Sequence, residues 1–304
     1  MRGVKVIAVL LVVCLCFCGC SARKNLKDLS VAEGLGIDNA EQGKRVTVQT
    51  LNLAKAGNGT AALSGNVTLN TAGIGRNISS AAAAAAESLS KDLFFGQNKL
   101  LVFGMDVAVN DLATCFDYLM RSENSRPDVP VCISSGTAAQ LLDCGQNDAL
   151  VPAQAVAELL KNGQNSGFSL YVSVNEMLNL YKDKTSDICL PVITVSDESS
   201  RTSGIAIFSE SRLAGVLSGD ETVGLLFLKD KVKSGYMELE SEKYGNIGVR
   251  IIGASSKTKA FAQGETVHFK VGVKLFFSID EIENGTKESL SDAELAEIGK
   301  EVEN

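Results

Sequence analysis

The sequence predicts an α+β protein, with a mixed N-terminal α+β domain followed by a domain built on an antiparallel sheet with packed helices. Up to residue 198, short apolar runs typical of strands alternate with segments whose apolar residues repeat at helical spacing. The polar stretch 197–203 ends this alternation of predicted strands and helices and indicates a domain boundary. Beyond it, two long runs of alternating apolar and polar residues predict an antiparallel sheet with one polar face.

The expected first domain, residues 31–198, opens with short strands and one alanine-rich helix. Apolar and polar residues alternate in the strands, and the polar loop 39–44 suits a hairpin. In chain order the expected elements are strand 31–38, strand 45–53, a weaker strand near 61–69, a helix from Ser79 to about Lys91, and a buried strand at 100–103.

Helix signals dominate the rest of the first domain. Asn110 is expected to cap a helix whose buried face carries Leu112, Cys115, Phe116 and Leu119, at the i, i+3, i+4, i+7 spacing. A strand follows at 129–133. Three further helix starts are indicated by a capping box or by proline in the first turn: Thr137 with Gln140, Pro152, and Ser173 with Glu176.

The expected second domain, residues 199–304, begins with a hairpin of strands 204–208 and 213–217 that turns at 209–212. Asp220 is expected to cap a short helix. Two long strands then alternate, one through 247–251 and the other through 269–277. Ser291 and Glu294 cap a last helix, which reaches Val302 without a C-terminal signal, so either the tail is short or the chain is truncated.

The N-terminus is typical of a bacterial lipoprotein signal peptide. Arg2 and Lys5 precede an apolar run, which is followed by Phe17-Cys18-Gly19-Cys20. We expect residues 1–19 to be removed, Cys20 to carry the lipid, and residues 20–30 to form a tether. A diacylglyceryl cysteine provides the two acyl chains that stable anchoring needs. An ordinary cleaved signal and an uncleaved N-terminal anchor are the alternatives.

Composition narrows the possible partners. Residues 1–19 hold two positive charges and no acids, so removing them changes the formal charge from -7 to -9. Such an acidic chain argues against nucleic-acid binding and against electrostatic docking on anionic lipids. The lipid is therefore expected to hold the protein on the outer face of the cytoplasmic membrane.

The sequence lacks the usual catalytic and metal-binding motifs. It has no GxSxG, P-loop, HExxH or CxxC outside the signal, and His268 is its single histidine. We expect no metal, no cofactor and no catalytic residue, hence no enzyme. Four cysteines remain after the signal, and buried thiols are favoured over disulfides: Cys115, Cys132, Cys144 and Cys189.

Three blocks in order resemble one family. Residues 94–104 read FFGQNKLLVFG, where the family has an aromatic residue, Gly-His-Asn-Lys, a hydrophobic strand and glycine. Residues 152–160 with Leu190-Pro191 resemble the second block. Residues 204–208, 213–217 and 221–226 resemble the third. Together with the lipobox, these blocks are similar to the Ger(x)C family, the lipoprotein C subunits of spore germinant receptors.

The resemblance implies a role in a membrane complex. Such C subunits work with an integral-membrane A subunit and a transporter-like B subunit, on the outer face of the spore inner membrane. Nutrients trigger the complex, and germination follows. Membership implies a non-catalytic subunit needed for nutrient-triggered germination, and it leaves open whether the C subunit binds a nutrient directly.

Four residues of these blocks are candidates for an interaction surface: Gly96, Asn98, Lys99 and Glu221. Each also has a purely structural interpretation. Gly96 and Asn98 would form a turn, Lys99 would be solvated, and Glu221 would complement the positive end of a helix.

Two other classes of function stay open. A solute-binding lipoprotein that delivers a small molecule to a transporter would share the anchor and the two-domain size. The absence of tryptophan and the predicted antiparallel second domain argue against this hypothesis. An envelope enzyme using Asp220 or Glu221 would need a pocket with strongly perturbed carboxylates.

Overall fold

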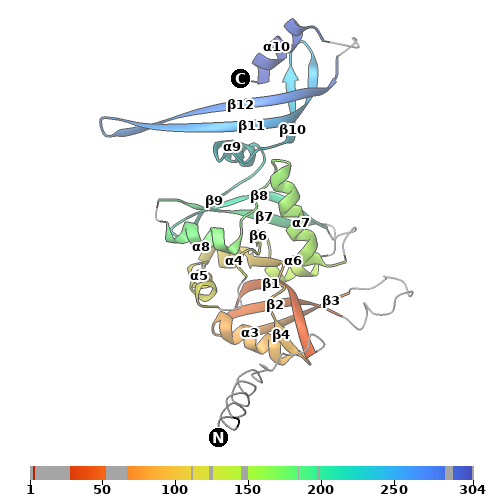
Figure 1. Cartoon of the computed structure of the whole chain (residues 1–304), viewed down its shortest axis with the longest axis vertical. Helices are drawn as coiled ribbons and strands as arrows, with labels where there is room; N and C mark the ends of the chain where they lie inside the picture. Colours follow the sequence, from red (N-terminus) through yellow and green to blue (C-terminus); the bar gives the residue numbers. More distant parts are fainter. Residues whose placement is uncertain are drawn as a thin grey trace, which may run out of the picture.

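The protein consists of two sheets joined through one short helix. The structure is a computed structural model that describes residues 3, 28–52, 67–110, 112–122, 126–144, 150–183, 185–196, 199–284 and 290–302. In Figure 1, the first sheet and its helices form the body, and the second sheet lies at the C-terminal end. The α+β class predicted from the sequence is confirmed.

The first sheet contains nine of the described strands, in the order β3-β2-β1-β5-β6-β7-β8-β9, with β4 beside β1. The central strands β1, β5, β6 and β7 are parallel, and antiparallel strands extend both edges. The bounds are β1 (Leu29–Ala40), β2 (Gly43–Leu51), β3 (Thr68–Gly75), β4 (Asp92–Phe94), β5 (Leu100–Gly104), β6 (Val131–Ser134), β7 (Ile188–Ser196), β8 (Ser199–Ser209) and β9 (Arg212–Leu217).

Helices cover both faces of the parallel centre. Leu101 and Phe103 of β5 belong to the larger core, whereas Leu100 and Val102 pack in a second core with α6 and α7. Because neighbouring residues of a strand point to opposite faces, β5 is buried on both sides. The helices are α3 (Ile78–Glu87), α4 (Met105–Asn110), α5 (Leu112–Arg121), α6 (Ala138–Asp143), α7 (Pro152–Asn165) and α8 (Val174–Lys182).

The second sheet is antiparallel, in the order β10-β11-β12. Its strands are β10 (Gly235–Ser241), β11 (Gly245–Gln263) and β12 (Thr266–Ile282), and α9 (Asp220–Leu228) lies between the two sheets (Figure 1). Helix α10 (Asp292–Val302) buries Ile298 in a small core of this sheet. Strands β11 and β12 continue beyond β10 as a two-stranded arm (Figure 1).

Several predicted helix features are confirmed. The expected face of α5 is buried along its length, and the capping box of Thr137 with Gln140 is formed. Ser173 accepts a hydrogen bond from the Glu176 N–H at the start of α8. Pro152 is the first residue of α7. These features depend on neighbours within one helical turn, which explains why the sequence is enough to predict them.

Other expectations are corrected. Asn110 ends α4 instead of capping the next helix, and its side chain donates to the Asp106 carbonyl. The alanine-rich helix, expected from Ser79 to about Lys91, begins at Ile78 behind the cap residue Asn77 and ends at Glu87. Asp220 is the first residue of α9 and Gly219 occupies the cap without a side-chain hydrogen bond. The weak strand lies at Thr68–Gly75, because those residues pair with β2.

The hairpin expected at the start of the second domain extends the first sheet. Strand β8 pairs with β7 and β9 pairs with β8, so the sheet is continuous across the expected boundary at 198/199. Ile205, Ala206 and Phe208 are buried in the larger core. Strands adjacent in the chain commonly pair as hairpins, which places β8 beside β7 and leaves β9 at the edge of the sheet.

Candidate functional site

The turn between β4 and β5 carries three of the four candidate residues. Both flanking strands pair in parallel with β1, and the Lys99 N–H donates to the Glu33 carbonyl of β1 at 2.8 Å. The Asn98 N–H donates to the Phe95 carbonyl at 3.0 Å and closes the turn. The backbone of the turn is thus tied to β1 at Lys99.

Arg126 reaches this turn from the segment before β6. Its Nη1 donates to the Gly96 carbonyl at 3.4 Å, and its Nε and Nη2 donate to the two carboxylate oxygens of Asp128 at 3.0 and 2.6 Å. The hydrogen bonds from Arg126 hold the pKa of the Asp128 carboxyl below its usual range. Because Asp128 is exposed and Arg126 only half-buried, the pair orients Arg126 more than it stabilises the fold.

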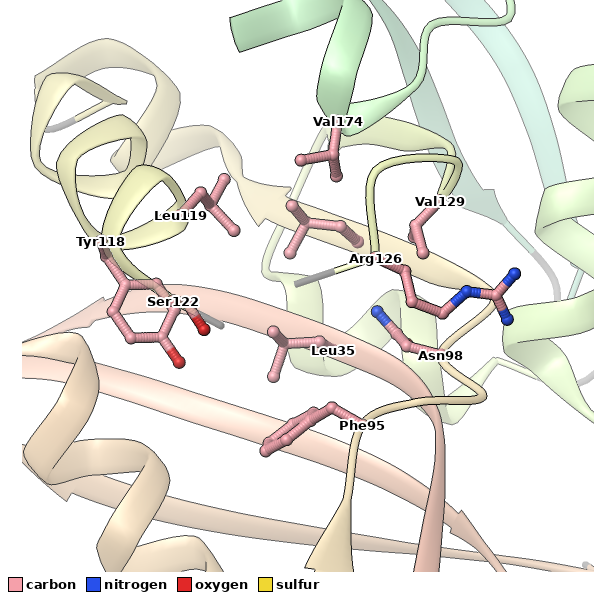
Figure 2. A pocket seen from close by; sticks show the side chains of 10 residues that line it. Leu35, Phe95, Asn98, Tyr118, Leu119, Ser122, Arg126, Val129 and Val174 are labelled. Carbon is pink, nitrogen blue, oxygen red and sulfur yellow. The ribbon is translucent and has the colours of Figure 1, made fainter. Parts of the chain in front are cut away.

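Asn98 is the buried centre of the site. Its side chain is only 8% exposed, and its Oδ1 has no hydrogen-bond partner among the described residues. Figure 2 shows it just below Arg126, with Leu35 beside it and Phe95 lower in the view. A buried amide oxygen without a partner is uncommon, since it loses its hydration without compensation.

Asn98 lines two cavities. The one that also contains Leu35 and Phe95 is small and mainly apolar. Its volume is about 30 Å³, enough for a water molecule or two. Burial raises the pKa of the Tyr118 hydroxyl, and a hydrogen bond with Ser122 partly offsets the rise. Its walls, shown in Figure 2, come from β1, β5, α5 and the starts of β6 and α8: Leu35, Phe95, Leu101, Tyr118, Leu119, Ser122, Val129 and Val174.

A second cavity, of about 430 Å³, opens on the other side and is polar. It shares Asn98, Arg126 and Val129 with the first and adds Lys99 and residues of α7. Gln154 of α7 donates to Glu33 at 2.9 Å, which ties that helix to β1. Burial, followed by the nearby Asp128 charge, raises the pKa of Tyr171. The charged side chains of its wall are Lys99, Arg126, Asp128, Glu158 and Lys161.

We call the two cavities and their shared residues the Asn98 site. Their walls contain neither histidine nor cysteine, so a Ser–His or Cys–His pair has no counterpart there. The site offers an unpartnered amide oxygen, cationic side chains and an apolar recess. That combination suits recognition of a polar group through hydrogen bonds and charge.

Glu221 does not join this site. It lies in the first turn of α9, is exposed, and lines neither cavity. The structure therefore brings together Gly96, Asn98 and Lys99 and leaves Glu221 apart. Arg126, Asp128 and Tyr171 also line the site and were not predicted from the sequence. The first two flank Pro127 just before a predicted strand, a loop position that could have drawn attention.

Other predicted features fall outside the site. Cys20 and the remaining signal-peptide residues, apart from Gly3, lie outside the described residues. None of the helices in the described ranges is long and apolar enough to cross a membrane. The same ranges contain no group of three metal-binding side chains. All four cysteines of the body are buried, and burial raises the pKa of the Cys132 and Cys189 thiols.

Comparison with known proteins gives two family models that follow one another along the chain. Residues 22–195 match the spore germination protein N-terminal domain, and residues 203–304 match the spore germination B3/GerAC-like C-terminal domain. A curated relative, the putative spore germination protein YfkR of Bacillus subtilis (strain 168), is 23% identical over 235 residues. That alignment covers 73% of this chain and 60% of the relative's length.

Among solved structures, the chain is similar to the GerBC protein. The TM-score is 0.47 with 16% sequence identity, and the match covers 91% of this chain and 79% of the other.

Proposed function

Because the chain belongs to the GerAC-like, or Ger(x)C, family of spore germination proteins, we propose that it is the non-catalytic C subunit of a nutrient-responsive germinant receptor. In this role it interacts with membrane-embedded A and B subunits and is needed for nutrient-triggered germination. The observation that carries the proposal is the succession of the two family models, which together span most of the chain.

The proposed location is the outer face of the spore inner membrane, where a lipid on Cys20 anchors the protein. The lipobox sequence and the acidic charge of the chain support this anchor, since an acidic protein gains little from anionic lipid headgroups. The described fold starts at residue 28, a few residues after Cys20, so the tether would keep β1 and the first sheet close to the membrane.

The Asn98 site is the proposed contact for a partner subunit. The backbone of its turn is bonded to β1 through Lys99, and the Asn98 amide oxygen, which has no partner among the described residues, lines the same cavity as the cationic side chains of Lys99 and Arg126. A partner segment with an exposed N–H group and a carboxylate would satisfy both features. Contact energy at interfaces concentrates in a few such desolvated groups.

Deletion of the gene, followed by complementation, tests the proposal. Spores of the deletion strain should lose germination with nutrients and keep germination with a non-nutrient trigger. The wild-type gene should restore the response. Cys20→Ala should restore it poorly and release the protein from the membrane fraction, whereas Cys18→Ala, two residues away, should behave as wild type. Normal nutrient germination of a deletion strain without paralogues would refute the role.

A further inference from the structure

Among the described elements, helices pack on only one face of the second sheet. Three residues of β11 mark that face, since they pack against α10 or belong to the larger core: Ile247, Val249 and Ile251. Alternate residues of a strand point to opposite faces and cross-strand partners share a face, so the paired residues Tyr236 and Arg250 lie on the other side. The even-numbered residues of β12 from His268 to Ser278 lie there too. We call this side the outer face.

The outer face is divided into a cationic half and an anionic half. The arm half carries four exposed lysines, and the half beside β10 carries three exposed glutamates: Lys257, Lys259, Lys270 and Lys274, then Glu238, Glu240 and Glu281. Each of the seven side chains is without an ion pair among the described residues. Lys259 lies directly opposite Lys270 on the neighbouring strand, an arrangement that is repulsive by itself. Charges of one sign gathered in this way attract a partner of opposite charge.

The boundary between the two halves is apolar. Phe276 is 66% exposed and pairs with Gly253, and Ile252, in the adjacent β-bulge, is 64% exposed. On β11, Gly253 lies about midway between Gly248, which is aligned with two of the glutamates, and Lys259. An apolar centre with charged residues around it is typical of a protein–protein interface.

The separation of charge indicates which partner fits. An anionic membrane or a uniformly acidic protein would bring negative charge onto the glutamates as well as onto the lysines. A second copy of this chain, related by a two-fold axis through the apolar boundary, would place the lysines of each copy over the glutamates of the other. Such a dimer uses both halves of the outer face, and this local attraction opposes the long-range repulsion of two chains that each carry a net charge of -7.

We propose that the chain forms a dimer in which the outer faces of two second sheets pack on each other, around a two-fold axis near Phe276. The two Phe276 rings would meet at the axis, and the four lysines of each copy would pair with the three glutamates of the other. Sheets that pack face to face lie about 10 Å apart, a gap that opposed lysine and glutamate side chains span together. The arm, which extends past β10 in Figure 1, would thereby gain a neighbour along its length.

Sedimentation equilibrium of the full chain, in a detergent matched to the density of the solvent, tests the proposal. The wild type should reach the mass of two copies as its concentration rises. An arm variant, with the four lysines changed to glutamate, and a base variant, with the three glutamates changed to lysine, should each be monomeric because like charges then meet. An equimolar mixture of the two variants should regain the dimer, since each reversed half again meets its opposite.

The control for charge reversal is Lys91→Glu with Lys182→Glu, which changes two exposed lysines of the first domain and should dimerise as wild type does. A wild-type chain that stays monomeric at the highest concentration reached would overturn the proposal. So would a mixture that stays monomeric although both variants keep the wild-type melting temperature.

Crosslinking locates the axis without altering a charge. Phe276→Cys should form a disulfide between two copies under mild oxidation, because the axis brings the two positions together. Phe269→Cys is the matched control, since Phe269 is similarly exposed on the opposite face of the same strand, and it should stay monomeric. The described cysteines of the wild type are all buried and add no background. Equal crosslinking of both variants, or none of Phe276→Cys, would contradict the assignment.

Discussion

At the scale of single residues, Asn98 combines burial with an amide oxygen that no described group satisfies. We predict that Asn98→Leu keeps the free energy of unfolding or raises it by about 1 kcal/mol, because the variant removes a desolvated polar atom at similar volume. The same variant should fail to restore nutrient germination in the deletion strain. Urea unfolding measures the first effect, and a spore germination assay measures the second.

Asn162→Leu is the control for this substitution, since Asn162 is exposed on α7 and lines neither cavity of the Asn98 site. It should leave germination intact. A loss of stability of several kcal/mol in Asn98→Leu, with the control stable, would instead make Asn98 a structural residue of the turn.

Glu297 makes the packing of α10 sensitive to pH. Its Oε2 accepts hydrogen bonds from Lys243 Nζ at 2.5 Å and from the Tyr244 hydroxyl at 2.9 Å. These bonds, first from Lys243 and then from Tyr244, lower the pKa of the Glu297 carboxyl below its ordinary value of 4.5. Its contribution to stability is therefore present above that value and is lost as the pH falls through the lowered one.

We predict that Glu297→Gln flattens the fall of the urea midpoint between about pH 7 and about pH 3, because glutamine does not titrate. Glu240→Gln, on the exposed side of β10, removes a carboxylate from the same sheet and should keep the wild-type slope. Equal slopes in the wild type and Glu297→Gln would show that the hydrogen bonds to Glu297 add nothing to stability.

At the scale of elements, the alanine-rich helix α3 owes its composition to close packing on β3. A Cβ added at Gly73 would collide with the backbone of α3 at Ala81, Ala84 and Ala85. Gly73→Ala should therefore push the helix from the strand and cost about 1–3 kcal/mol of unfolding free energy. Gly272→Ala, on β12 with open space around it, should cost far less, as urea unfolding can compare.

The same distinction between local and distant neighbours explains which elements the sequence predicts. The buried face of α5 and the cap at Thr137 involve residues within two turns, so the pattern of side chains is sufficient. Strand β7 contains Pro191, which argues against a central strand, and its parallel partner β6 lies over 50 residues away in the chain. Such pairing forms between segments that are distant in the chain, so the sequence around either strand does not indicate it.

Strand β12 shows that a correctly predicted alternation does not predict burial. The predicted alternation is real, and Val267, Phe269, Val271 and Val273 share one face of the arm. These side chains are nevertheless exposed, because the arm extends beyond β10 and α10. Periodicity predicts which residues face together but not what covers them. The Asn98 site has the same limit, since its turn is visible in the sequence whereas Arg126 and Tyr171 reach it only through the fold.

At the scale of the whole molecule, the two sheets differ greatly in the cores that hold them. The first sheet is packed on both faces by helices, whereas the core of the second has four buried residues among those described: Tyr244, Ile247, Val249 and Ile298. Ile251 of β11 and Val232, just before β10, belong to the core of the first sheet. The second sheet is thus stabilised in part by its contact with the first.

This difference predicts how the chain behaves when it is divided after Lys233. Fragment 28–233 should unfold cooperatively in urea, because it retains the second core and, apart from Ile251, every buried residue of the larger core. Fragment 234–304 should lack cooperative unfolding, since three strands with so small a core cannot offset the entropy of ordering that many residues. Circular dichroism during urea titration would measure both.

Mixing the fragments should restore structure to the second only if the contacts of Ile251 re-form, and an Ile251→Ala version of fragment 234–304 should then fail to respond. A cooperative transition of fragment 234–304 alone would show that the second sheet is an independent folding unit.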